Sequence, residues 1–146
     1  MDLLKVARVP PILVSPSMMV AEAVGRMVAQ NVGAVVVANS DRHVVGIFTE
    51  RDVLRRVTHP QLQTDAVPVS DVMTTMVETA TPETKIEDAL ERMIRGRFRH
   101  LPIVDTSNRV IGIVSIRYLL MRQLGENRLM RRLMDEFIST PDLAHA

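Results

Sequence analysis

The chain has 146 residues, 47% of them hydrophobic and 24% charged, which is long enough and apolar enough for one globular domain with a real core. It has no cysteine, which excludes disulfides and thiolate metal sites, and its net charge of +1 gives no reason to expect a nucleic acid or a membrane as partner. No apolar run approaches the roughly 20 residues that span a bilayer, and the N-terminus lacks the pattern of a signal peptide, so we expect a cytoplasmic protein.

The first half of the chain predicts a helix, two strands and a second helix. Ser15 and Pro16 are typical of a helix start, and apolar residues then recur at helical spacing. Two short β-branched runs follow, and Asn and Asp between them favour a tight turn. In chain order, the expected elements are a helix that begins at Ser15 and Pro16 and continues through Val28, a strand over 34–38, a strand over 44–48 and a helix that begins near Arg51.

The second half repeats this order after a connector. Pro60, Pro68 and weak periodicity mark residues 59–69 as the connector, which should end in a short turn at 70–73. Thr81 and Pro82 indicate the next helix start. The expected elements are a helix that begins at Thr81 and Pro82 and continues through Ile94, a strand over 101–104, a strand over 110–114 and a helix that begins near Arg117.

The two halves are copies of one unit. Shifting the chain by 66 residues sets 15–56 over 81–122 without a gap, and ten of the 42 pairs are identical. Unrelated segments would match at about three positions, taking average residue usage at each site. One copy is too small to bury its own apolar faces, so we expect the two copies to pack together.

After Gly125, which is typical of a helix stop, a further helix is expected. Its apolar residues fall on one face and are Leu129, Met130, Leu133, Met134 and Phe137. Two covers for this face remain open: the chain's own domain, or a second copy of the chain in a homodimer. Residues 139–146 should form a frayed tail.

Four segments together resemble the cystathionine β-synthase (CBS) domain, repeated in tandem as a Bateman module. They are "VVGIFTERD" (44–52), "VSDVMT" (69–74), "RHLPIVD" (99–105) and "NRVIGIVS" (108–115). The resemblance covers about residues 4–123 and implies an α/β module in which two repeats pack sheet to sheet around a pseudo-twofold axis. It also implies a homodimer and a regulatory sensor of adenosine-containing ligands such as AMP, ADP, ATP, NAD(H) or S-adenosylmethionine, which would bind between the repeats as effectors. The implied division is repeat 1 over 4–58, a connector over 59–69, repeat 2 over 70–123, and a C-terminal helix and tail over 124–146.

The resemblance places a nucleotide site at the end of the second strand. An adenine nucleotide needs an apolar slot for the base, an acceptor for the ribose hydroxyls and donors or cations for the phosphates. Asp52 would accept from the ribose, Thr49 would lie by a phosphate near a helix N-terminus, and Arg51 would add charge. The resemblance also implies contacts from both repeats that flank the base: Ile47, Ser70, Thr75, Phe98, Arg99, His100 and Pro102. Arg99 and His100 would in addition face the phosphates.

Thr49 and Asp52 also fit a purely structural role. Thr49 can cap the helix, and Asp52 in the first turn favours the helix dipole without any ligand. The local sequence does not separate the two roles, and it is the surrounding duplication that favours a ligand.

The second copy departs from the pattern. At the position of Asp52 it has Tyr118, whose single hydroxyl cannot offer the two acceptor oxygens that a vicinal diol prefers. We therefore expect the second cleft to bind more weakly, to be empty or to take a different ligand. The residues of this cleft are Gly33, Ala34, Ile113, Ser115, Arg117 and Tyr118.

No catalytic motif is present, so we expect no enzyme and no required cofactor. The sequence has no Walker loop, no dinucleotide fingerprint and no nucleophile elbow, and its histidines lack metal-ligand spacing. A ligand sensor that acts on an unidentified protein target is therefore the main hypothesis. The alternative is a scaffold for dimerisation or docking whose clefts are vestigial.

Overall fold

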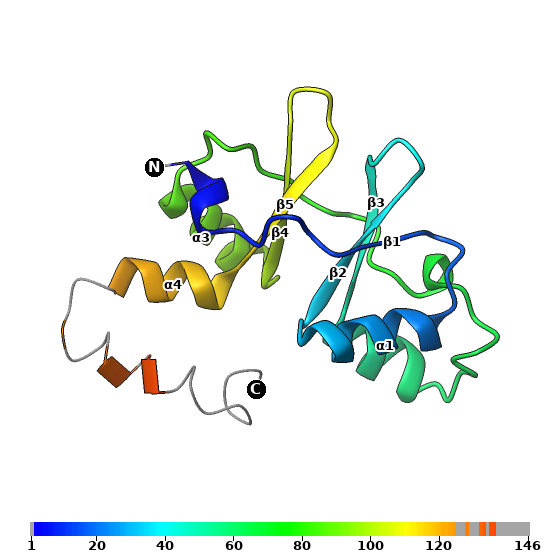
Figure 1. The fold of residues 1–146 in the computed structure, drawn as a ribbon. Helices are drawn as coiled ribbons and strands as arrows, with labels where there is room; N and C mark the ends of the chain where they lie inside the picture. Colours follow the sequence, from blue (N-terminus) through cyan, green and yellow to red (C-terminus); the bar gives the residue numbers. More distant parts are fainter. Residues whose placement is uncertain (1, 125–127, 129–131, 134, 137–146) are drawn as a thin grey trace.

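Two α/β lobes make up the structure (Figure 1). This computed structural model describes residues 2–124, 128, 132–133 and 135–136. The first lobe contains β1 (Leu13–Val14), α1 (Val20–Gln30), β2 (Ala34–Ala38), β3 (Val44–Thr49), α2 (Glu50–Asp52) and the π-helical segment η2 (Val53–Thr58). The second lobe contains α3 (Ile86–Gly96), β4 (His100–Val104), β5 (Val110–Ser115) and α4 (Ile116–Leu124). Two 3-10 helices, η1 (Leu3–Val6) and η3 (Val69–Asp71), complete the described elements.

Each lobe is built on a β-hairpin, as the sequence predicts. β2 pairs with β3 and β4 pairs with β5, both antiparallel, while β1 lies parallel to β2. The turn of each hairpin is stabilised by one side chain: Asn39 Oδ1 accepts from two backbone amides in the first, and Asp105 Oδ1 does so in the second. The four predicted strands and the two helices that follow the hairpins are therefore confirmed to within one or two residues.

The predicted starts of the other two helices are wrong. α1 begins at Val20 and α3 at Ile86, and neither has a side-chain cap. The first amide of α1 donates instead to the carbonyl of Val67, and the amide of Ala21 donates to that of Thr64. The connector thus satisfies the helix N-terminus, and Ser15 and Pro16 lie in the approach to the helix.

The segment that leads into each copy packs on the lobe of the other copy. Leu3 and Val6 of η1 are buried in the core of the second lobe, whereas Val69 and the following Val72 are buried in the core of the first. Figure 1 shows the N-terminal segment running from the second lobe across to β1. The two lobes are thereby linked by exchanged segments.

The repeated glycines Gly46 and Gly112 lie where these segments cross the hairpins. A Cβ at Gly46 would meet the side chain of Met73 and, at 3.0 Å, the carbonyl oxygen of Thr74. A Cβ at Gly112 would meet Leu4 Cδ2 at 3.1 Å. Both positions therefore need glycine for close approach of another segment.

The two sheets pack against each other through a third apolar cluster. Ala34, Val36 and Ile47 of the first lobe share this cluster with Val110 and Ile113 of the second. A β-bridge between His43 and Arg109 joins the hairpins near their turns. The expected sheet-to-sheet packing of two repeats in one α/β module is confirmed.

The predicted C-terminal helix lies almost wholly outside the described residues, so its apolar face and the expected homodimer stay predictions. Among the helices that the structure describes, none is long and apolar enough to cross a bilayer.

Candidate functional site

Asp52 lies in the first turn after β3, where the strand becomes a helix. Its Oδ2 accepts from the Thr49 amide at 3.0 Å and from the Thr49 hydroxyl at 3.1 Å. Thr49 Oγ1 in turn accepts from the Asp52 amide at 3.2 Å, which completes a capping box. The two residues with the spacing of a nucleotide motif are thus held together by the start of the helix.

The other carboxylate oxygen of Asp52 is also occupied. Thr74 Oγ1 donates to Asp52 Oδ1 at 3.0 Å, and Arg56 Nε lies 3.6 Å from the same oxygen. A carboxylate has about four lone-pair positions, and three of these accept hydrogen bonds while Arg56 lies in ion-pair contact. Asp52 is only 5% exposed, so a ribose could bind it only by displacing Thr74 or Arg56.

The lead-in segment of the second copy (residues 70–75), which follows the connector, is fixed to this site at several points. Thr74 exchanges two backbone hydrogen bonds of 2.9 Å with Ile47, and Arg56 Nη1 donates to the Met73 carbonyl at 3.0 Å. Of the predicted base contacts, Ile47 therefore lies next to the segment that carries Thr74. Ser70, in η3, and Thr75 are both exposed, and Pro102 is buried in β4.

Three further predicted residues, Arg51, Phe98 and Arg99, come together at a cavity between the lobes. This cavity has a volume of about 410 Å³. Its other lining residues are Arg55, Met93, Ile94, Arg97 and Ile116. Thr49 and Asp52 do not line it, although Arg51 lies between them in the sequence. We call it the arginine groove.

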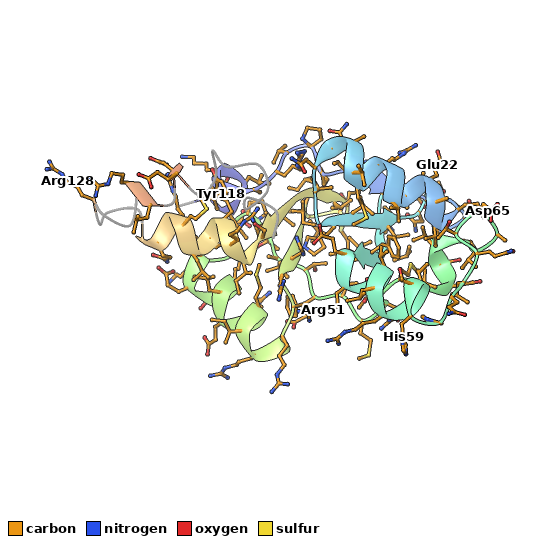
Figure 2. The ribbon with its side chains drawn as sticks, turned by 90° about the horizontal axis from the view of Figure 1, so that it is seen from below. Glu22, Arg51, His59, Asp65, Tyr118 and Arg128 are labelled. Carbon is orange, nitrogen blue, oxygen red and sulfur yellow. The ribbon has the colours of Figure 1, made fainter. Side chains whose placement is uncertain are left out.

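A larger cavity, of about 730 Å³, lies at the second cleft. Its lining includes all six residues predicted for that cleft: Gly33, Ala34, Ile113, Ser115, Arg117 and Tyr118. It is also lined by Arg99 and His100, which we had placed by the phosphates of the Asp52 site, and by Arg8 and Glu50. Tyr118, on α4, is 51% exposed (Figure 2). In this conformation the cavity at the second cleft is therefore the larger of the two, and Arg99 lines both cavities.

His100 is the titratable group most altered by this environment. Burial, together with the guanidinium groups of Arg99 and Arg117, lowers the pKa of His100 from 6.5 to about 4. The imidazole is therefore neutral at physiological pH. An anion bound in the cavity would offset the two guanidinium groups and raise this pKa.

Sequence reasoning missed four residues that shape the Asp52 site. Thr74 and Arg56 contact its carboxylate, while Arg55 and Arg97 line the arginine groove. The 66-residue offset gives one signal for Thr74, because it pairs Thr74 with Arg8. The two residues are equivalent in the structure: Arg8 forms a β-bridge with Ile113, and Thr74 forms one with Ile47. Periodicity within each copy does not reveal a contact that a crossing segment makes.

No metal centre is indicated in the part of the chain that the structure describes. There, no group of three or more His, Asp or Glu side chains is placed to hold an ion. The chemistry at these cavities is that of arginines, hydroxyls and apolar walls, which suits an anionic organic ligand.

Comparison with known proteins agrees with this arrangement. A sequence model of the CBS domain matches residues 4–59 and 69–125. The chain is 40% identical over 107 residues to an uncharacterised 17.7 kDa protein of Acidianus ambivalens, which covers 73% of this chain and 63% of that protein. It is 37% identical over 112 residues to the CBS domain-containing protein YhcV of Bacillus subtilis, covering 77% of this chain and 78% of YhcV.

Other curated relatives are much longer than the region matched. The chain spans 17% of a CBS domain-containing protein of Arabidopsis thaliana and 21% of an inosine-5'-monophosphate dehydrogenase of Methanocaldococcus jannaschii. The catalytic activity of the dehydrogenase therefore does not transfer to this chain.

Solved structures show the same fold. A CBS-domain protein from Agrobacterium tumefaciens is 34% identical with a TM-score of 0.73, covering 79% of this chain and 90% of that one. CBSX2, solved in complex with AMP, is 26% identical with a TM-score of 0.71, covering 84% of this chain and 94% of that one.

Proposed function

This chain belongs to the CBS-domain family as a tandem pair, and we propose that it is a regulatory module, not an enzyme, that binds an adenosine-containing ligand at the Asp52 site. The ligand is an effector of the AMP, ADP, ATP, NAD(H) or S-adenosylmethionine class. Its occupancy changes how the lobes, or two copies of the chain, pack, and a protein target responds to that change. We also expect a cytoplasmic location and a homodimer.

The observation that carries this proposal is the Asp52 carboxylate at the strand–helix junction. It is buried, it is fixed by Thr49, and its second oxygen is held by two groups that can leave: a threonine hydroxyl and an arginine at 3.6 Å. The Thr74 hydroxyl occupies the acceptor that a ribose hydroxyl would use. The AMP complex of the related CBSX2 supports the ligand class.

Transmission of a signal has a structural basis in the lead-in segment of the second copy, which carries Met73 and Thr74. A ribose that displaces Thr74 from Asp52 would loosen a segment that also pairs with Ile47 and, through Met73, contacts Arg56. A ligand shifts an equilibrium only through different affinity for its two states. Displacement of Thr74 supplies such a difference.

The second candidate is a scaffold whose clefts are vestigial. The observation that favours it is the same carboxylate, because in this conformation both oxygens of Asp52 already accept hydrogen bonds from within the protein. The scaffold hypothesis predicts that no adenosyl ligand changes the protein's stability.

Calorimetric titration of the purified protein with AMP, ATP, NADH and S-adenosylmethionine separates the two candidates. Asp52→Asn retains a capping side chain but lacks the charge and one acceptor oxygen, so it should weaken binding at least about tenfold. Tyr118→Phe is the matched control at the equivalent position of the second copy and should bind as the wild type does. A wild-type protein that binds none of the four, once co-purified nucleotide is removed, would sink the proposal.

A further inference from the structure

The arginine groove combines four cations with no carboxylate. Arg51 and Arg55 lie one helical turn apart on α2 and η2, and Arg97 and Arg99 flank the entrance to β4. Figure 2 shows Arg51 on the side of its helix that faces the second lobe. Like charges so close together repel, so the arrangement costs free energy unless an anion is bound.

Three arginines elsewhere in the described structure have ion pairs with carboxylates. Arg95 lies 2.7 Å from Glu91, Arg26 lies 3.6 Å from Glu22, and Arg56 contacts Asp52. None of the four groove arginines has an ion pair with a carboxylate among the described residues. Arg51 donates instead to the Arg97 carbonyl at 3.2 Å, which orients its guanidinium at the groove.

Arg97 occupies a backbone conformation that disfavours arginine. It follows α3 with a φ of 57°, in the left-handed region, where glycine or asparagine is preferred. The equivalent residue of the first copy is Asn31, with a φ of 58°. Arginine is therefore an unfavourable choice for the backbone at this position, and its side chain lines the groove.

The groove is also specific to one side of the molecule. At the 66-residue offset, its four arginines correspond to Arg117, Met121, Asn31 and Gly33, which include a single cation. The second cavity is lined by Arg8, Arg99 and Arg117 together with Glu50. The groove therefore has one more arginine than the second cavity and lacks its carboxylate.

We propose that the arginine groove is an oligophosphate subsite that extends the Asp52 site, so that the ligand of this chain is an adenosine di- or triphosphate. This inference rests on the proposed function. Arg51, which lies between Thr49 and Asp52, joins the two parts of the site. Four guanidinium groups match the charge and the paired oxygens of a phosphate chain better than those of a monophosphate. S-adenosylmethionine has no phosphate and is disfavoured.

The test replaces two groove arginines with the residues that the other copy carries. Arg55→Met and Arg97→Asn are combined, and AMP, ADP and ATP are titrated by calorimetry. Both side chains are exposed, so the fold should be retained, which thermal unfolding checks. We expect ATP to bind wild type more tightly than AMP, and the double variant to lose about tenfold or more in ATP affinity while AMP changes little.

Arg95→Gln is the control, because it removes the same charge from an exposed arginine of α3 outside the groove. It should leave both affinities unchanged. Equal losses for AMP and ATP in the double variant, or wild-type ATP binding no tighter than AMP binding, would overturn the groove as a subsite while leaving the Asp52 site intact.

Inorganic tripolyphosphate separates failure of the groove from failure of the proposed function. If no adenine nucleotide binds wild type, the proposed function fails. Tripolyphosphate binding that is lost in the double variant but kept in Arg95→Gln would still establish the groove as an oligophosphate site. Absence of both kinds of binding overturns the inference as well.

Discussion

At the residue scale, the Asp52 carboxylate has two roles. Its hydrogen bonds to Thr49 stabilise the start of α2. Its hydrogen bond from Thr74 fixes the lead-in segment of the second copy, and Arg56 lies in ion-pair contact with the same oxygen. The structural and ligand-binding roles of this pair share one carboxylate, and Oδ1, which Thr74 and Arg56 now contact, is the oxygen that a ribose hydroxyl would reach by displacing them.

Removing the Thr74 hydroxyl should strengthen nucleotide binding. Thr74→Val keeps the shape of the side chain but frees Asp52 Oδ1, so the ribose no longer has to displace a hydrogen bond. We expect AMP affinity to rise by about threefold to tenfold while the free energy of unfolding falls by about 1 kcal/mol. Calorimetry and urea unfolding measure the two effects.

Thr106→Val is the control, because Thr106 is an exposed threonine of the second hairpin turn and makes no hydrogen bond to Asp52. It should change neither quantity. Weaker AMP binding in Thr74→Val would show that the hydroxyl contacts the ligand instead of competing with it.

His100 should make the stability of the protein depend on pH. Because its pKa is lowered from 6.5 to about 4, the folded protein binds fewer protons than the unfolded chain between these values. The free energy of unfolding therefore falls as the pH drops through this window, by at most about 3 kcal/mol in all.

Urea unfolding from about pH 7 to about pH 4 measures this dependence. His100→Gln cannot titrate, so it should lose this part of the pH dependence. Identical pH profiles for wild type and variant would contradict the assignment to His100.

At the element scale, local pattern predicted the hairpins but not the helix starts. The strands were predictable because β-branched runs flank turns whose Asn39 and Asp105 make their bonds within a few residues. The start of α1 was not, because its first amides are satisfied by the distant Val67 and Thr64 carbonyls. Two tertiary hydrogen bonds therefore take the place of the side-chain cap that the sequence predicted at Ser15.

The N-terminal helix η1 should behave as part of the second lobe. Leu3 is fully buried there, so Leu3→Ala should lower the free energy of unfolding by about 2–5 kcal/mol. Leu54→Ala, at a leucine that is 63% exposed, should change it by no more than about 0.5 kcal/mol. Equal effects of the two substitutions in urea unfolding would show that η1 does not belong to that core.

At the scale of the whole molecule, the duplication predicted that the two copies pack together and that their ligand clefts differ. The 66-residue offset identified Tyr118 as the substitute for Asp52, and the structure adds that the cavities differ as well. The order of their affinities stays a prediction. The offset could not show that the segment before each copy packs on the lobe of the other copy. The periodicity of a copy is the same whichever lobe this segment contacts.

The location of the ligand decides the central claim, and an NMR titration with ATP observes it directly. Amide resonances of Thr49, Asp52 and Thr74 should shift at substoichiometric ATP, while those of Arg117 and Tyr118 remain in place. Shifts confined to Arg117 and Tyr118, with Thr49, Asp52 and Thr74 unmoved, would contradict the account.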